Sequence, residues 1–133
     1  NKNIAFVSNK TYDLLRSSTA ALVTSGTATL ETALFKVPEV VCYKGSSISY
    51  QIAKRIITLK YISLVNLIMD QEVVTELIQS ECNTKRIKEE LNKLLEPSYR
   101  TKLLKNYDIL EEKLGGVGAS KKTAKLIVAD LKA

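Results

Sequence analysis

A short run of small and hydroxyl-bearing residues, Ser25-Gly26-Thr27-Ala28-Thr29, is the part of the sequence best suited to chemistry. An apolar stretch precedes it and helix-forming residues follow it, so the run is predicted to lie at a strand-to-helix turn. The first N–H groups of a helix are unpaired and carry partial positive charge, and Gly26 lets a ligand approach the backbone closely. This turn is therefore suited to binding a phosphate group.

Glu31 follows the glycine of this run by about one helical turn. A carboxylate there could accept hydrogen bonds from both hydroxyl groups of a ribose, the role of the acidic residue in dinucleotide-binding folds. The structural alternative is that Ser25 or Thr27 caps the helix and that Glu31 is an ordinary first-turn carboxylate. The residues alone leave both alternatives open. They exclude a P-loop, because no Gly-Lys-Ser or Gly-Lys-Thr follows.

Composition limits the other kinds of chemistry. The chain has 133 residues, 45% of them hydrophobic and 26% charged, as expected for one globular domain. It contains no histidine, so the commonest general base near neutral pH is absent and a zinc site is not expected. Cys42 and Cys82 are interpreted as reduced, buried thiols of a cytoplasmic protein. We expect neither a metal nor a cofactor.

The net charge of +6 is unevenly distributed. Residues 40–69 hold no acidic residue, yet they include Lys44, Lys54, Arg55 and Lys60. Such a balance can indicate nucleic acid, an anionic membrane or a phosphorylated ligand. Aromatic residues make up only 6% of the chain and no nucleic-acid-binding motif is present, so nucleic acid is not expected as a partner. No apolar run approaches the roughly 20 residues that span a bilayer, and no signal peptide is predicted.

The elements that must position the turn alternate between strand and helix over residues 1–84, which favours right-handed βαβ units and a parallel sheet. Strands are predicted at residues 4–7, 20–24, 40–43 and 61–64, and helices at 11–18, 27–35, 48–59 and 74–79. The apolar strand at 20–24 is expected to be buried on both faces. Leu14 and Leu15 are expected to point inward, and a turn is expected around Asn66.

Residues 85–133 are predicted to be helical. Asn83 or Thr84 is a candidate N-cap for the first helix, Pro97 can open the second, and Gly115-Gly116 ends it. A last helix with one apolar face begins near residue 119. The expected fold class is α/β, with about four parallel strands flanked by helices and a helical C-terminal tail, which is half of a doubly wound fold.

Residues 21–31, Ala-Leu-Val-Thr-Ser-Gly-Thr-Ala-Thr-Leu-Glu, resemble the SGTATLE signature of the lipid-A-disaccharide synthases. Further segments resemble that family in the same order, and the likeness covers nearly the whole chain: residues 38–44, 53–55, 61–67 and 76–79. Val65 departs from the family pattern, which usually has proline there. This change could soften the turn at Asn66, but it removes no functional group.

The resemblance implies a two-domain glycosyltransferase of the GT-B fold. Residues 1–84 would form a Rossmann-like domain that binds a nucleotide sugar, and residues 85–133 would complete it and reach toward an N-terminal domain absent from this chain. The family joins UDP-2,3-diacylglucosamine to 2,3-diacylglucosamine 1-phosphate, giving a β-1,6-linked disaccharide 1-phosphate and UDP. By resemblance the enzyme is cytoplasmic and peripheral on the inner membrane of a Gram-negative bacterium. The general base is expected in the N-terminal domain, so this chain alone is expected to be inactive.

The same resemblance assigns roles to individual residues. The diphosphate is expected at Ser25, Gly26, Thr27 and Thr29, and the ribose at Glu31. Asn66 and Gln79 are expected to contact the donor sugar or the diphosphate; the structural alternative is that they are turn or helix-capping amides.

Lys54, Arg55 and Lys60 are candidates for contact with the inner-membrane surface, and the structural alternative is that they are solvated cations on a core helix. Two other functions stay open. One is another UDP-sugar enzyme of GT-B type, such as a 2-epimerase or a different glycosyltransferase. The other is a non-catalytic domain that binds a nucleotide or a protein.

Overall fold

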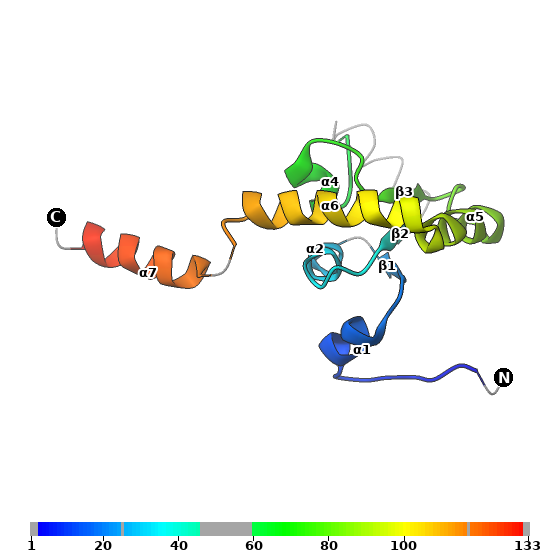
Figure 1. Cartoon of the computed structure of the whole chain (residues 1–133), viewed down its shortest axis with the longest axis horizontal. Helices are drawn as coiled ribbons and strands as arrows, with labels where there is room; N and C mark the ends of the chain where they lie inside the picture. The colour runs from blue at the N-terminus through cyan, green and yellow to red at the C-terminus, as the bar shows by residue number, and fades with distance from the viewer. Residues whose placement is uncertain (1–2, 25, 46–59, 117, 132–133) are drawn as a thin grey trace.

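The computed structural model describes residues 3–24, 26–45, 60–116 and 118–131. Over these ranges the chain is an α/β structure with three parallel strands and six helices (Figure 1). The strands are β1 (Ala21–Thr24), β2 (Glu39–Tyr43) and β3 (Thr75–Ile78). The helices are α1 (Thr11–Ser17), α2 (Thr27–Leu34), α4 (Leu64–Met69), α5 (Thr84–Leu95), α6 (Pro97–Lys113) and α7 (Ala119–Asp130). The predicted fold class is confirmed, while the helix predicted at 48–59 lies outside the described residues.

The sheet has the order β1-β2-β3. Ala21 lies opposite Glu39, and Val40 lies opposite Thr75. The central strand β2 is fully buried at Val40 and Val41, as expected for a strand with neighbours on both sides. The prediction that β1 is buried on both faces is wrong: its side chains alternate in exposure, so one face of this strand is partly covered and the other is open.

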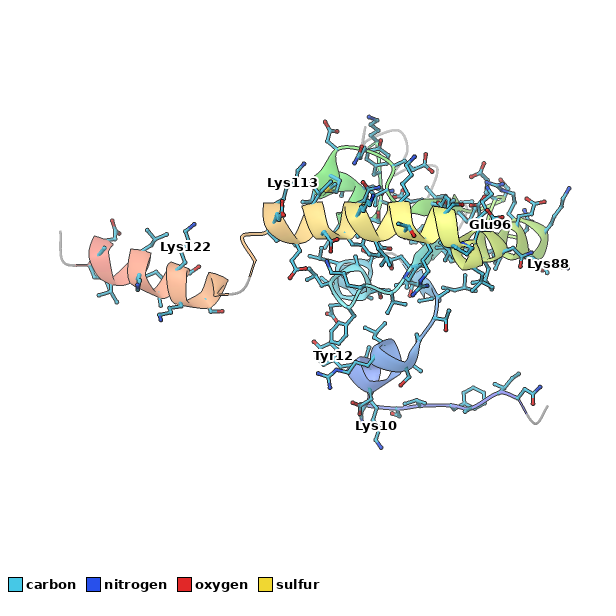
Figure 2. The ribbon with its side chains drawn as sticks, in the orientation of Figure 1. Lys10, Tyr12, Lys88, Glu96, Lys113 and Lys122 are labelled. Carbon is cyan, nitrogen blue, oxygen red and sulfur yellow. The ribbon has the colours of Figure 1, made fainter. Side chains whose placement is uncertain are left out.

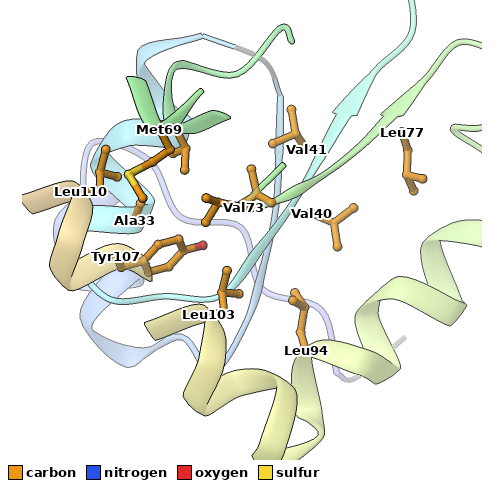
Figure 3. Packing of buried hydrophobic residues seen from close by; sticks show 12 residues of the cluster. Ala33, Val40, Val41, Met69, Val73, Leu77, Leu94, Leu103, Tyr107 and Leu110 are labelled. Atoms are coloured by element: carbon orange, nitrogen blue, oxygen red, sulfur yellow. The ribbon is translucent and has the colours of Figure 1, made fainter. Parts of the chain in front are cut away.

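The hydrophobic core lies between the sheet and the helices α2, α4, α5 and α6 (Figure 3). Helix α6 contributes Leu103, Tyr107 and Leu110, which are almost completely buried. Each large apolar side chain buried in this way contributes about 1.5–3 kcal/mol to folding. Lys36, directly after α2, forms ion pairs of 2.7 Å with Asp108 and Glu111 of α6. The helix that follows the glycine turn is thus fixed to the longest helix.

The N-terminal segment differs from the prediction. Residues 4–8 have no strand structure, and the side chain of Phe6 is 98% exposed. A strand gains its stability from pairing, and among the described residues no strand lies beside this segment. In α1 the prediction is correct for Leu15, which is buried, and wrong for Leu14, which is exposed.

The order of helix and strand is reversed near residues 61–79. A strand was expected at 61–64 and a turn around Asn66, but the chain forms α4, and β3 replaces the helix expected at 74–79. The side chain of Ser63 accepts a hydrogen bond of 3.3 Å from the backbone N–H of Asn66 and so caps α4. The apolar run at 62–68 is too short to distinguish helix from strand by its period.

The C-terminal helices follow the predicted signals. The Asn83 side chain accepts from the backbone N–H of Arg86 at 3.0 Å and caps α5. Pro97 opens α6, and after α6 the glycines at 115 and 116 take positive φ angles. Helix α7 lies away from the sheet (Figure 1), and its large apolar side chains are exposed, Leu126 by 65%. Within the described residues, no helix combines the length and apolar character needed to cross a bilayer.

Candidate functional site

The C-terminal ends of the three parallel strands lie at the same end of the sheet, and there β1 leads into α2. Gly26 lies at this junction with φ = 141°, a conformation that residues with a Cβ rarely adopt. An added Cβ would meet no atom within 4 Å, so the requirement for glycine comes from the backbone angle. Ser25, also predicted to bind here, lies outside the described residues. The turn therefore has the backbone conformation that the sequence indicated.

Among the described residues, no side chain caps the N-terminus of α2. Its N-cap residue is Gly26, Thr27 is the first helical residue, and the first turn contains no carboxylate. Thr27 is exposed. The structural alternative in which Thr27 caps the helix is therefore not what the structure shows. The first turn of α2 holds no acidic residue that would offset the partial positive charge of its first N–H groups, which suits an anion-binding site.

Thr29 stabilises the turn from inside. Its side chain is fully buried, and its hydroxyl donates a hydrogen bond of 2.8 Å to the carbonyl oxygen of Gly26. Its backbone N–H donates to the same oxygen at 3.2 Å. Because the hydroxyl proton is already used, Thr29 can give a ligand no hydroxyl hydrogen bond without losing this one. In this arrangement Thr29 shapes the turn.

Glu31 is half-buried and lines a cavity of about 470 Å³. The other wall is residues 9–13, at the start of α1. Tyr12 of α1 stacks on Phe35, one turn beyond Glu31, with ring centroids 5.1 Å apart and planes at 15°. Figure 2 shows Tyr12 on the side of α1 that faces α2. The stacking holds the start of α1 beside the carboxylate, and nothing in the sequence pattern had indicated this wall.

Asn66 lies on α4 in the interior of the protein and is fully buried. Its Oδ1 accepts hydrogen bonds from the backbone N–H groups of Val73, at 2.7 Å, and Val74, at 2.9 Å. Its Nδ2 donates to the carbonyl oxygen of Val74 at 2.8 Å and to Glu76 Oε1 at 2.9 Å. The amide makes all four bonds that such a group can make. Contact between this amide and a donor would require one of them to break.

Glu76 is the partner that sequence reasoning missed. Its carboxylate accepts four hydrogen bonds of 2.8–2.9 Å, from the backbone N–H groups of Ile62 and Ser63, the Ser63 hydroxyl and the Asn66 amide. A signal was present, since Glu76 opens one of the segments that resemble the family, but no role followed from it. We call Ser63, Asn66 and Glu76 the Asn66 network. It fixes the segment that enters α4 onto β3.

Gln79 follows β3 directly and adopts the left-handed conformation, with φ = 53°. Its backbone N–H donates to the carbonyl oxygen of Tyr43 at 2.8 Å, which holds the end of β3 against the end of β2. Its side-chain Nε2 is buried and has no hydrogen-bond partner among the described residues. A buried donor without a partner costs about 1–3 kcal/mol, which a ligand oxygen could recover.

The predicted site residues thus fall into three groups. Gly26, Thr27 and Glu31 lie on the turn and first part of α2, and Gln79 lies at the same C-terminal end of the parallel strands, after β3. Asn66 lies in the interior network. Of the membrane candidates, Lys54 and Arg55 lie outside the described residues. Lys60 is exposed, with its Nζ 5.0 Å from the centre of the Tyr61 ring.

Comparison with known proteins points to one family. Residues 1–128 match the family model described as lipid-A-disaccharide synthetase. The chain is 38% identical over 130 residues to the lipid-A-disaccharide synthase of Syntrophus aciditrophicus, which covers 97% of this chain and 34% of that protein. For the synthase of Geobacter sulfurreducens the identity is 35% over 127 residues, covering 95% and 33%. The chain therefore spans about a third of the length of these curated relatives.

Proposed function

The chain belongs to the lipid-A-disaccharide synthetase family, and we propose that it forms the part of the enzyme that binds the nucleotide-sugar donor. The observation that carries this proposal is the uncapped N-terminus of α2 beside the Glu31 cavity. The whole protein would transfer a diacylglucosamine from UDP-2,3-diacylglucosamine to 2,3-diacylglucosamine 1-phosphate and release UDP. In this proposal residues 1–84 bind the donor, and residues 85–133 complete the domain.

The diphosphate of the donor would lie at the turn before α2. Negative charge builds up on this group as the bond from the sugar carbon to the diphosphate oxygen breaks. Backbone N–H groups already directed at that position stabilise the charge without reorganising. Thr27 can add its exposed hydroxyl, while Thr29 keeps the carbonyl of Gly26 turned away.

The nucleoside would occupy the cavity between Glu31 and residues 9–13. Its volume of about 470 Å³ falls within the usual range of small-molecule sites. The Glu31 carboxylate would accept hydrogen bonds from the two ribose hydroxyls. The stacked rings of Tyr12 and Phe35 keep the cavity walls in place, so little ordering is needed when the ligand binds.

Gln79 would contact the donor sugar or the diphosphate through Nε2, the buried donor that has no partner among the described residues. Asn66 would affect donor binding only indirectly, because the Asn66 network holds the segment that enters α4. By resemblance to the family, the general base would belong to another part of the longer enzyme. These 133 residues alone would then bind the donor but form no disaccharide, because the acceptor and the base would be held by other parts of the longer enzyme.

Contact with the inner membrane would follow from the acylated substrates. Lys60 is exposed and would contribute with Lys54 and Arg55, which lie outside the described residues. A cation near an anionic leaflet contributes about 1 kcal/mol, and salt screens it. The double substitution Lys54→Glu and Arg55→Glu should lower co-sedimentation with anionic vesicles and leave UDP affinity unchanged. Wild-type protein that ignores such vesicles at low salt would contradict this part of the proposal.

Titration calorimetry with two ligands tests the donor site. Glu31→Ala should weaken UDP binding by about 1–3 kcal/mol, the range for a charged hydrogen-bonding group, and should leave inorganic pyrophosphate binding nearly unchanged. Glu112→Ala, an exposed carboxylate on α6, is the matched control and should change neither affinity. Equal losses for UDP and pyrophosphate would remove Glu31 from the ribose site.

A further inference from the structure

A second cavity, of about 130 Å³, lies between helix α6 and the loop that joins α4 to β3. This loop enters β3 at the N-terminal end of the strand, whereas the glycine turn follows the C-terminal end of β1. The described residues that line the two cavities are entirely different. The second cavity is therefore separate from the proposed donor site. Its lining residues are Glu72, Val73, Tyr99, Lys102, Leu103 and Asn106.

Both walls of this cavity are held in place by the fold. The four lining residues of α6 follow the helical spacing i, i+3, i+4 and i+7, so they lie on one face of the helix. On the loop, the backbone N–H of Val73 donates to Asn66 Oδ1 at 2.7 Å, and that of Gln71 donates to the Asn66 carbonyl oxygen at 3.3 Å. Val73 and Leu103 are buried members of the core cluster (Figure 3). The cavity is thus preformed and has an apolar inner surface.

The polar side chains around this surface are free to bind a ligand. Lys102 and Glu72 carry opposite charges and are both exposed, yet no ion pair joins them to each other or to another described residue. The Asn106 amide and the Tyr99 hydroxyl form no hydrogen bond with a described residue. A cation, an anion and an amide around an apolar surface are complementary to a small molecule that carries both a carboxylate and an ammonium group.

We propose that this cavity binds a small zwitterion of the α-amino acid class. The Lys102 ammonium group binds the carboxylate, and the Glu72 carboxylate binds the ammonium group. The Asn106 amide can donate to the first or accept from the second. A cavity of about 150 Å³ is large enough to hold benzene, with its six carbon atoms. A volume of about 130 Å³ therefore suits an amino acid of the size of alanine or serine.

Such a ligand would connect two elements that the protein holds separately. It joins Lys102 of α6 to Glu72 of the loop that the Asn66 network anchors, so binding should stabilise the folded protein. With so few atoms, the ligand is expected to bind with a Kd of roughly 1 mM. This site does not depend on the proposed function, because it lies at the other end of the sheet and shares no described lining residue with the Glu31 cavity.

The test titrates the purified protein with L-alanine and follows backbone amide NMR. Saturable shift changes are expected at Glu72, Val73 and Lys102, and little change at Thr27 in the glycine turn. Lys102→Met and Glu72→Gln should each weaken binding roughly tenfold or more, because each removes one charged partner of the ligand. Lys105→Met, an exposed lysine of the same helix that does not line the cavity, is the matched control and should bind as wild type does.

Thermal denaturation gives a second measurement. Amino acids at high concentration also stabilise proteins because they are excluded from the surface, and that effect should be equal in wild type and Lys102→Met. A larger rise in Tm for wild type than for Lys102→Met, at about 50 mM alanine, is the part that reports binding. Lys102 is exposed, so the substitution should leave the fold intact. Equal rises in the two proteins would contradict the site.

Two further results would overturn the proposal. The first is the absence of saturable shift changes at about 100 mM alanine, a hundred times the expected Kd. The second is acetate that binds wild type as tightly as alanine does, because acetate has no ammonium group for Glu72 and should bind at least roughly tenfold more weakly. Either result would leave the proposed donor site untouched, since UDP binding is measured separately.

Discussion

At the turn between β1 and α2, no side chain in the described part of the chain caps the first N–H groups of the helix, whereas in the Asn66 network each polar atom of the central amide has a partner. The sequence predicted that both regions contact the donor. Polar groups left unpaired at the C-terminal ends of the strands can bind a ligand without first breaking a hydrogen bond within the protein. Polar groups paired in the interior hold the chain in one conformation, and their removal is costly. The comparison thus separates residues that would bind the donor from residues that hold the backbone in position.

Substitution in the Asn66 network should have the largest effect on folding. Asn66→Ala removes the acceptor of two buried backbone N–H groups and one donor to Glu76. We expect the free energy of unfolding to fall by about 3–5 kcal/mol, measured by urea denaturation. Asn92→Ala, an exposed amide on α5, should change it by less than about 0.5 kcal/mol. A stable Asn66→Ala protein that binds UDP weakly would instead make Asn66 a direct contact.

Glu39 sharpens the comparison, because its carboxyl group is also unpaired among the described residues, yet it lies at the N-terminal end of β2, opposite the glycine turn. Its carboxyl group is fully buried and has no hydrogen-bond partner among the described residues. Burial raises its pKa to about 9, so the group is uncharged at neutral pH. An unpaired polar group is therefore not by itself a ligand site. Here it makes stability depend on pH.

The direction of that dependence follows from the raised pKa. Below about pH 4.5 the carboxyl group is protonated in both states and its contribution to stability is fully present. As pH rises toward 9, only the unfolded state releases the proton, so stability falls, by up to about 1.4 kcal/mol per pH unit. Urea denaturation of wild type at pH 6 and pH 8.5 should show this loss, and Glu39→Gln should remove most of it. An equal loss in Glu39→Gln would contradict the assignment.

Substitution in the glycine turn should have a smaller effect on folding. Gly26→Ala places a Cβ at φ = 141°, where the surroundings leave room but the backbone is strained. We expect a loss of stability of about 1–3 kcal/mol together with weaker UDP binding. Gly115→Ala has a similar strain at φ = 86°, far from the turn, and should leave UDP binding unchanged. Normal UDP affinity in Gly26→Ala would show that the turn does not shape the site.

Local signals in the sequence predicted the glycine turn and the helix ends correctly. Gly26, Asn83 and Pro97 act on backbone atoms within a few residues, so their effects can be inferred from neighbours in the sequence. The order of α4 and β3 could not be inferred in this way. The cap of α4 is Ser63, and Ser63 is held by Glu76, 13 residues later in the chain. That pairing exists only in the folded protein.

The cavity beside Glu31 and the charge state of Glu39 also depend on long-range packing. Glu31 was identified from its spacing after Gly26, but its second wall comes from the stacking of Tyr12 on Phe35. Glu39 appeared only as part of a strand, because nothing in its neighbours indicates complete burial. Residues 4–7 show the opposite error. Their composition is typical of a strand, but a strand also needs a partner, and the described chain places none beside them.

The most direct test of the account is a UDP titration followed by backbone amide NMR of the 14.8 kDa protein. The account predicts the largest shift changes at Thr27, Ala28 and Glu31, a smaller change at Gln79, and little change at Val73 and Val74, whose N–H groups bond to Asn66. Saturable changes centred on the first turn of α2 would support a donor site there. Changes centred on the Asn66 network or on α6, or no change at millimolar UDP, would contradict it.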